Sequence, residues 1–231
     1  MTAFLADAAW PELEGGGDLL IVPLGATEQH GPHLPLATDS EIALALAAAT
    51  AAELPGATVA PLLPYGASGE HEGFAGTVSI GHAALELVLV ELGRSASASF
   101  DRLLLLCAHG GNAEPLASAV ARLRGEGREV RAWSPRWDGD AHAGRTETSL
   151  ILALAPDRVR VAAAAAGNAA PLPELLPALR AGGVRAVAAN GVLGDPAGAS
   201  AEEGRELLGA AVADLVAGIE EWTASAEGRA A

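Results

Sequence analysis

The chain has 231 residues, half of them apolar, with a net charge of −15 and one cysteine. This length fits one domain over residues 1–231 that needs no disulfide framework, and the acidity argues against nucleic acid and membrane as partners. The absence of lysine excludes Schiff-base catalysis and a Walker A phosphate-binding loop. The sequence shows no signal peptide and no apolar membrane span, so we expect a cytoplasmic protein.

Apolar runs alternate along the chain with helical patterns, which predicts an α/β fold. Strands are expected at 18–24, 57–63, 77–80, 102–107 and 129–133, and helices at 40–53, 82–98, 113–124 and 201–223. Capping-box patterns start two of these helices, Thr38 with Glu41 and Ser200 with Glu203. Residues 146–154 fit helix and strand equally, and 167–200 are predicted to be mostly loop. Uninterrupted apolar strands such as 102–107 are typical of a mainly parallel sheet covered on both faces.

The segment after the first predicted strand is dense in possible metal ligands, Glu28-Gln29-His30-Gly31-Pro32-His33-Leu34-Pro35-Leu36-Ala37-Thr38-Asp39. In extended backbone Glu28 and His30 point the same way, so both can face one cluster. Asp39 falls at the start of the next helix, where the helix dipole favours a carboxylate. Carboxylates and imidazoles are the ligands of hydrolytic metal sites.

Two later segments add candidates. His109-Gly110-Gly111-Asn112 follows the strand at 102–107, and His142-Ala143-Gly144-Arg145-Thr146-Glu147-Thr148 comes after the strand at 129–133. Ligands of parallel sheets bind beyond the carboxyl ends of the strands, so we expect His109 to meet Glu28 and His30 at that edge. Glu147 is a candidate to complete the shell of a second ion; the alternative is a carboxylate that only complements a helix dipole.

This mixed oxygen and nitrogen set suits Zn²⁺, Mn²⁺ or Fe²⁺. Two such ions would lower the pKa of a bridging water and polarise a carbonyl, so we predict amide hydrolysis with two divalent ions per chain. His142 is the candidate for proton transfer to the leaving nitrogen. Other side chains are candidates for lining the substrate pocket, each with a structural alternative: His33, His71, Asn112 and Trp137. Cys107 is expected in the core.

At these residues the chain resembles the creatininase (creatinine amidohydrolase) family, over roughly residues 18–220. The resemblance rests on the segment from Leu24 to Asp39 and on the second and third motifs, in order and spacing. It implies a three-layer α/β/α sandwich, a homo-oligomer and a dinuclear centre. One ion would be held by Glu28 and His109 and the other by His30, with Asp39 bridging. Some members carry Glu where this chain has Gly111, and Glu147 is the expected substitute.

Two stretches, 65–77 and 191–196, resemble the mycofactocin-system branch of the family, as does the Asn-x-x-Pro-Leu-Pro core near Asn168. This resemblance implies a peptidase that releases the modified C-terminal Val-Tyr-derived unit of a short ribosomal precursor peptide. Arg145, which stands where many members have Glu, would then pair with a substrate carbonyl or anion.

Three other functions stay open at this stage. The first is hydrolysis of a small cyclic amide or a formamide, as with creatinine. The second is a mononuclear non-haem iron oxidoreductase, since two histidines and one carboxylate can hold a single Fe²⁺. The third is a non-catalytic interaction module.

Overall fold

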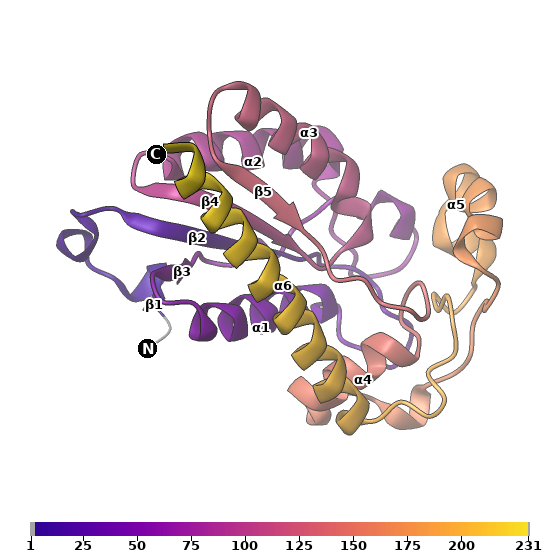
Figure 1. The fold of residues 1–231 in the computed structure, drawn as a ribbon. Helices are drawn as coiled ribbons and strands as arrows, with labels where there is room; N and C mark the ends of the chain where they lie inside the picture. Colours follow the sequence, from indigo (N-terminus) through magenta and orange to yellow (C-terminus); the bar gives the residue numbers. More distant parts are fainter. Residues whose placement is uncertain (1–2, 231) are drawn as a thin grey trace.

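One parallel sheet of five strands forms the centre of the computed structural model, which describes residues 3–230 (Figure 1). The strands lie in the order β1-β3-β2-β4-β5, and every pair is parallel. Their bounds are β1 Ala3–Phe4, β2 Gly17–Leu24, β3 Ala57–Val59, β4 Phe100–Cys107 and β5 Val130–Trp133. The two longest strands, β2 and β4, are therefore neighbours at the middle of the sheet.

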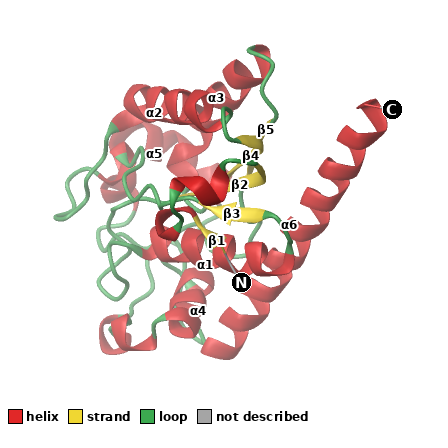
Figure 2. Cartoon of the chain, turned by 90° about the vertical axis from the view of Figure 1, so that its left-hand side faces the viewer, coloured by secondary structure: helices red, strands yellow, loops and turns green. Residues whose placement is uncertain are grey.

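Within residues 3–230, six α-helices accompany the sheet: α1 Thr38–Glu53, α2 Gly81–Ala96, α3 Ala113–Gly125, α4 Arg145–Leu154, α5 Leu172–Val187 and α6 Ala201–Ala230. Figure 2 shows α2 and α3 on one side of the sheet and α1, α4 and α6 on the other. The expected three-layer α/β/α arrangement is confirmed. None of the described helices is long and apolar enough to cross a membrane.

Alternation along the strands explains the two layers. In β2, Leu19 and Ile21 face the core shared with α1, α4 and α6, whereas Leu20 and Val22 face the core shared with α2 and α3. The register with β4 pairs Leu20 with Leu103, and these side chains lie on the same face. Because both faces are covered, the strands carry nearly continuous apolar sequence.

The segment 167–200, expected as loop, contains the 16-residue helix α5, so that expectation is wrong. Pro177 inside the helix and a non-helical Gly183 near its end mask the helical pattern in the sequence. The undecided segment at 146–154 is helical, as α4. Strand β3 ends at Val59, earlier than the predicted residue 63. The strand predicted at 77–80 is wrong, since this segment contributes only an isolated bridge from Val78 to Thr27. The short strand β1 is not predicted by the sequence.

Neither capping box forms as predicted. Thr38 lies inside α1, where its hydroxyl donates to the carbonyl of Pro35. Ser200 does accept from the backbone N–H of Glu203, at 3.2 Å, but the Glu203 carboxylate turns to Arg145 instead of reaching back. The ion pair between Glu203 and the distant Arg145 replaces the second hydrogen bond of a capping box, from the N-cap backbone N–H to the Glu side chain.

Candidate metal centre

The carboxyl ends of β2 and β4 and the first turns of α1 and α4 meet at one edge of the sheet. Glu28 and His30 follow β2, His109 follows β4, Asp39 lies in the first turn of α1 and Glu147 in that of α4. All but Glu147 are almost completely buried. The three segments selected from the sequence therefore converge, as parallel topology requires.

A close backbone approach brings the first two carboxylates together. A Cβ atom on Gly25 would lie 2.5 Å from Cα and 2.6 Å from the backbone N of Ser40, so only glycine fits where β2 passes the start of α1. The Ser40 hydroxyl donates to the carbonyl of Ala26 and holds this contact. Glu28 and Asp39, eleven positions apart in the sequence, reach the same buried site as a result.

Asp39 lies between two imidazoles. Its Oδ1 is 3.2 Å from Nε2 of His30, and its Oδ2 is 3.4 Å from Nδ1 of His109. Each ring has a backbone carbonyl at its other nitrogen: Nδ1 of His30 is 3.2 Å from the Glu28 carbonyl, and Nε2 of His109 is 3.0 Å from that of Ala67. Donation to these carbonyls leaves the nitrogens beside Asp39 free to bind a cation, as in metal-ligating histidines.

Two three-residue groups share Asp39, and each brings one possible ligand atom per residue within 4.8 Å of the others. One group is Glu28, Asp39 and His109; the other is His30, Asp39 and Glu147. The Glu28 carboxylate is 3.3 Å from Nε2 of His109, the nitrogen that donates to Ala67. The Glu147 carboxylate is 3.8 Å from Nε2 of His30, the nitrogen beside Asp39. This arrangement suits a pair of cations with Asp39 between them.

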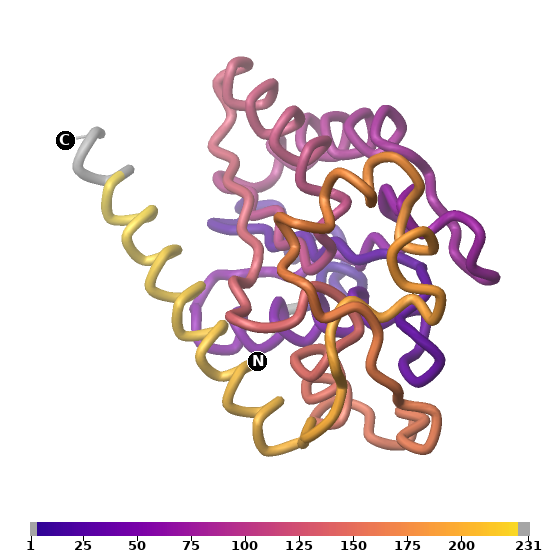
Figure 3. The backbone as a smooth tube through the Cα atoms, turned by 90° about the vertical axis from the view of Figure 1, so that its right-hand side faces the viewer, coloured from indigo at the N-terminus to yellow at the C-terminus, as the bar shows by residue number. Residues whose placement is uncertain are grey.

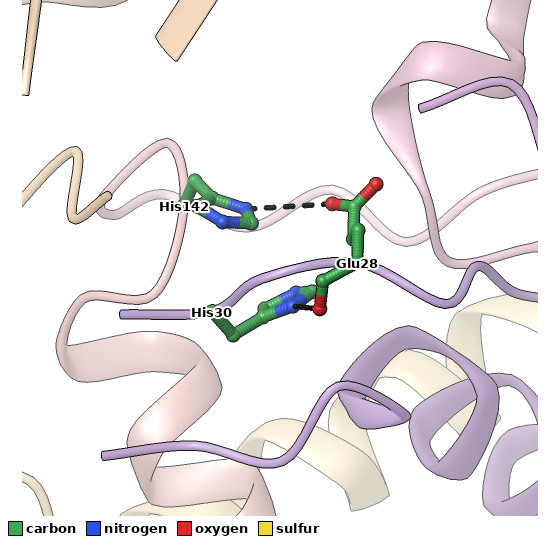
Figure 4. Close-up of side chains that lie close together, drawn as sticks. All are labelled: Glu28, His30 and His142. Atoms are coloured by element: carbon green, nitrogen blue, oxygen red, sulfur yellow. Dashed lines mark hydrogen bonds and ion pairs between the residues drawn. The ribbon is translucent and has the colours of Figure 1, made fainter. Parts of the chain in front are cut away.

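His142 approaches the cluster from the third motif, with Nδ1 3.8 Å from the carboxylate of Glu28 (Figure 4). Its Nε2 lies 2.9 Å from the carbonyl of Gln29, so that nitrogen carries the proton and Nδ1 faces Glu28. Ala143 follows with a φ of 53° and donates its N–H to Glu147 at 2.5 Å. This left-handed residue, uncommon for alanine, turns the chain from His142 into α4.

Gln29 is a functional candidate that the sequence analysis missed. Its Oε1 accepts from the N–H of Gly31 at 2.9 Å, which orients the amide. Its Nε2 then faces Nδ1 of His71 at 2.9 Å and the carbonyl of Gly191 at 3.0 Å. With Nδ1 accepting, His71 is protonated at Nε2, which lies 3.2 Å from Glu28. The Gln29 side chain thus sets the tautomer of His71, and its backbone carbonyl sets that of His142.

Burial perturbs the ionisation of the cluster. Burial and the neighbouring Asp39 raise the pKa of Glu28 to about 8. Burial alone would lower the pKa of His30, yet Asp39 and Glu147 raise it to about 10. Burial, together with His30, lowers the pKa of His71 to about 3 and that of His142 well below its ordinary value, so both rings are neutral.

The donor set fits divalent metal. Among the described residues, both carboxylate oxygens of Glu28 and Oδ2 of Asp39 are buried without a hydrogen-bond partner. Carboxylates that are buried without hydrogen bonds destabilise the folded protein unless a cation compensates their charge. Carboxylate oxygens and imidazole nitrogens together suit Zn²⁺, Mn²⁺ or Fe²⁺.

A cavity of about 460 Å³ opens onto the cluster. Its floor contains Glu28, His71, His109 and His142, and its wall contains Leu172, Leu176, Leu179, Val184 and Leu193. Glu70, His82, Glu114 and Arg180 also line it. A substrate in this cavity can present a carbonyl to the cluster while its apolar parts face α5.

Four residues predicted to line the pocket lie outside this cavity lining. Nε2 of His33 is 2.9 Å from the Thr148 hydroxyl, and the buried Asn112 amide joins Ala67 to Gly25. Arg145, about half exposed, forms an ion pair with Glu203, and Trp137 packs against the core. Asn112 does precede α3, but its side chain makes no cap hydrogen bond. Of the five residues predicted to line the pocket, His71 alone lies in the cluster.

Glu70 occupies the space that a side chain at position 111 would need. A Cβ atom on Gly111 would collide with the Glu70 carboxylate and lie 2.5 Å from Nε2 of His109. The carboxylate of Glu70 is 3.8 Å from the same nitrogen. Glu70 therefore places a carboxylate beside His109 although position 111 carries no acid, and Glu70 belongs to the 3₁₀ helix Gly69–His71.

The chain matches the family described as creatininase, creatinine amidohydrolase, over residues 6–219. It is 50% identical to the mycofactocin precursor peptide peptidase of Mycobacterium ulcerans (strain Agy99) over 231 residues, which covers 96% of this chain and 89% of the relative. It is 52% identical to the protein of the same name from Mycolicibacterium smegmatis (strain ATCC 700084 / mc(2)155) over 211 residues, covering 88% and 85%.

Solved creatininase structures share the fold. Two of them, one described as Zn-Zn type and one as creatininase Mn, each superpose with a TM-score of 0.81 at 27% identity, covering 96% of this chain and 98% of theirs. With the cluster at the sheet edge, these matches define a metal-dependent hydrolase that acts on amide bonds. The chain belongs to the creatininase family.

Proposed function

We propose that this hydrolase cleaves the modified C-terminal Val-Tyr-derived unit from a mycofactocin precursor peptide. The relatives that carry this peptidase name are about half identical to the chain over most of its length. The observation that carries the proposal is Asp39, whose two oxygens face His30 and His109, the second of which lines an open cavity. We also propose that residues 1–231 form one catalytic domain and that the chain assembles into a homo-oligomer.

Two divalent ions, Zn²⁺, Mn²⁺ or Fe²⁺, are proposed at this cluster. Glu28, Asp39 and His109 would hold one, and His30, Asp39 and Glu147 the other. Such ions supply Lewis acidity at the scissile carbonyl and an activated water. The carbonyls beside His30 and His109 keep the required nitrogens turned to Asp39, so the protein orients its ligands before any cation binds.

His142 is proposed to move the proton. Its Nε2–H is held by the Gln29 carbonyl, which leaves Nδ1 to accept a proton on the side of Glu28 and the cavity. Neutral imidazole is the form that a general base requires. The same Nδ1 can then deliver the proton to the amine that leaves as the amide bond breaks.

Metal analysis and peptide cleavage test the proposal together. Protein purified without chelator should contain about two divalent ions per chain and release a C-terminal fragment from a modified precursor peptide, detected by mass spectrometry. Hydrolysis of creatinine or of a formamide without peptide cleavage would favour the small-amide alternative. A single iron with oxygen consumption would favour the oxidoreductase.

A further inference from the structure

Helix α5 lies beyond the carboxyl ends of the strands, and Figure 3 shows its orange segment in front of the sheet on that side. It packs against the 3₁₀ helix Gly69–His71 and has a small core of its own: Leu175, Val184, Ala188 and Leu193. This core is separate from the two that cover the sheet. Contacts on the active-site side of the molecule therefore hold α5, rather than packing against the sheet.

One apolar stripe of α5 lies beside the buried Leu175, on the face of the helix that also carries this residue. Leu175 is 7% exposed and belongs to the small core. Leu172 and Leu176 remain 43% and 36% exposed, and with Leu179 they line the cavity. Spacings of four and three residues place these three leucines on one face of the helix. Leu179 packs partly against the small core, whereas Leu172 and Leu176 stay exposed where they line the cavity.

The end of α5 is anchored beside the cluster. Gly183 has a φ of 68° and packs so closely that a Cβ atom there would lie 2.6 Å from the backbone O of Glu70. Arg185 donates to the carbonyl of Gly73. Since Glu70 and Gly73 flank His71, which contacts Glu28, the leucine stripe is held at a set position relative to the cluster.

Charges around the cavity favour an uncharged group against this stripe. Glu70 and Glu114 are acidic, Arg180 is the one arginine in the lining, and the chain as a whole carries a charge of −15. A free carboxylate entering beside these acids would be repelled. An apolar side chain or ring would instead bury surface against the leucines, as in pockets that combine apolar walls with a few polar groups.

We propose that Leu172, Leu176 and Leu179 form a subsite for an uncharged apolar side chain next to the scissile amide. This rests on the proposed function, because the cluster places the scissile carbonyl. The subsite would make α5 the element that selects substrates by the hydrophobic group adjoining the bond that breaks.

Hydroxamates test the subsite without the natural substrate, because they chelate metal and carry a variable group. Zinc-loaded protein is titrated calorimetrically with acetohydroxamate and phenylacetohydroxamate. Wild-type protein should bind the phenyl compound on the order of 100-fold more tightly, and Leu176→Asn or Leu172→Asn should reduce this preference about tenfold. Acetohydroxamate affinity should not change in either variant. Leu87→Asn is the matched control, since Leu87 is 56% exposed on α2, outside the cavity lining.

The outcomes separate the two proposals. Normal acetohydroxamate binding with an unchanged phenyl preference in both variants would overturn the subsite alone. A change of oligomeric state in those variants, without a change of preference, would assign the stripe to a contact between copies and also overturn it. Failure of zinc-loaded wild-type protein to bind acetohydroxamate would overturn the metal centre and, with it, the subsite.

Discussion

Replacing Asp39 by asparagine removes the negative charge that both halves of the cluster share. Asp39 lies 3.2 Å from His30, a distance at which two unit charges interact by about 5 kcal/mol at an effective dielectric constant of about 20. In Asp39→Asn, a divalent cation at the same oxygen would lose at least this much electrostatic attraction. Asp39→Asn should therefore weaken metal binding by about 10³-fold or more, since each 1.4 kcal/mol or so is a factor of ten.

The assay is metal content after dialysis, measured by inductively coupled plasma mass spectrometry, alongside kcat/KM for peptide cleavage. We expect metal content to fall from about two ions per chain to one or none, with circular dichroism unchanged. Glu41→Gln is the matched control, because Glu41 lies on the same helix and pairs with Arg158 away from the cluster. Full metal content and full activity in Asp39→Asn would refute the shared-carboxylate reasoning.

Four further outcomes follow from the contacts. His142→Gln should lower kcat by about 10²- to 10⁴-fold at unchanged metal content; loss of metal instead would make His142 a ligand. Gln29→Leu should lower kcat about 10- to 100-fold with little effect on KM, by freeing the tautomer of His71. Wild-type kcat would contradict that role. Chelation of zinc-loaded protein should lower the Tm by about 8–16 °C in calorimetry, since saturating metal contributes about 4 kcal/mol; an unchanged Tm would argue against a resident metal. Leu106→Ala, at a fully buried strand position, should lower the free energy of unfolding in urea by about 2–5 kcal/mol. The exposed Leu87→Ala should lower it by less than about 0.5 kcal/mol. Equal losses in the two variants would contradict the assigned core.

The central strands and the cluster were predictable from local pattern. A run of leucines at 103–106 is typical of a strand buried on both faces, and β4 follows it. Once parallel strands are accepted, residues just after them must meet at one edge, which places His109 beside Glu28. The two-residue spacing of Glu28 and His30 adds that both point into the same site.

Interactions between distant residues were not predictable. Gln29 and His142 are 113 positions apart, and only the folded chain shows the Gln29 carbonyl beside the His142 ring. Arg145 was expected at the substrate, but Glu203 of α6 lies 2.9 Å from it. Pro177 and the glycines near its end hide helix α5 in the sequence, because these residues have weak helix propensity. In the folded chain α5 packs against the 3₁₀ helix Gly69–His71.

Sequence alone determined the α/β class, the sheet edge that carries the chemistry and the residue types that face it, because periodicity and strand ends are local properties. Only the tertiary structure decided which nitrogens turn toward Asp39, which acid fills the space at Gly111 and which helix walls the cavity. These depend on the side chains that distant segments bring within a few ångströms of one another, and that proximity is produced by packing of the whole chain.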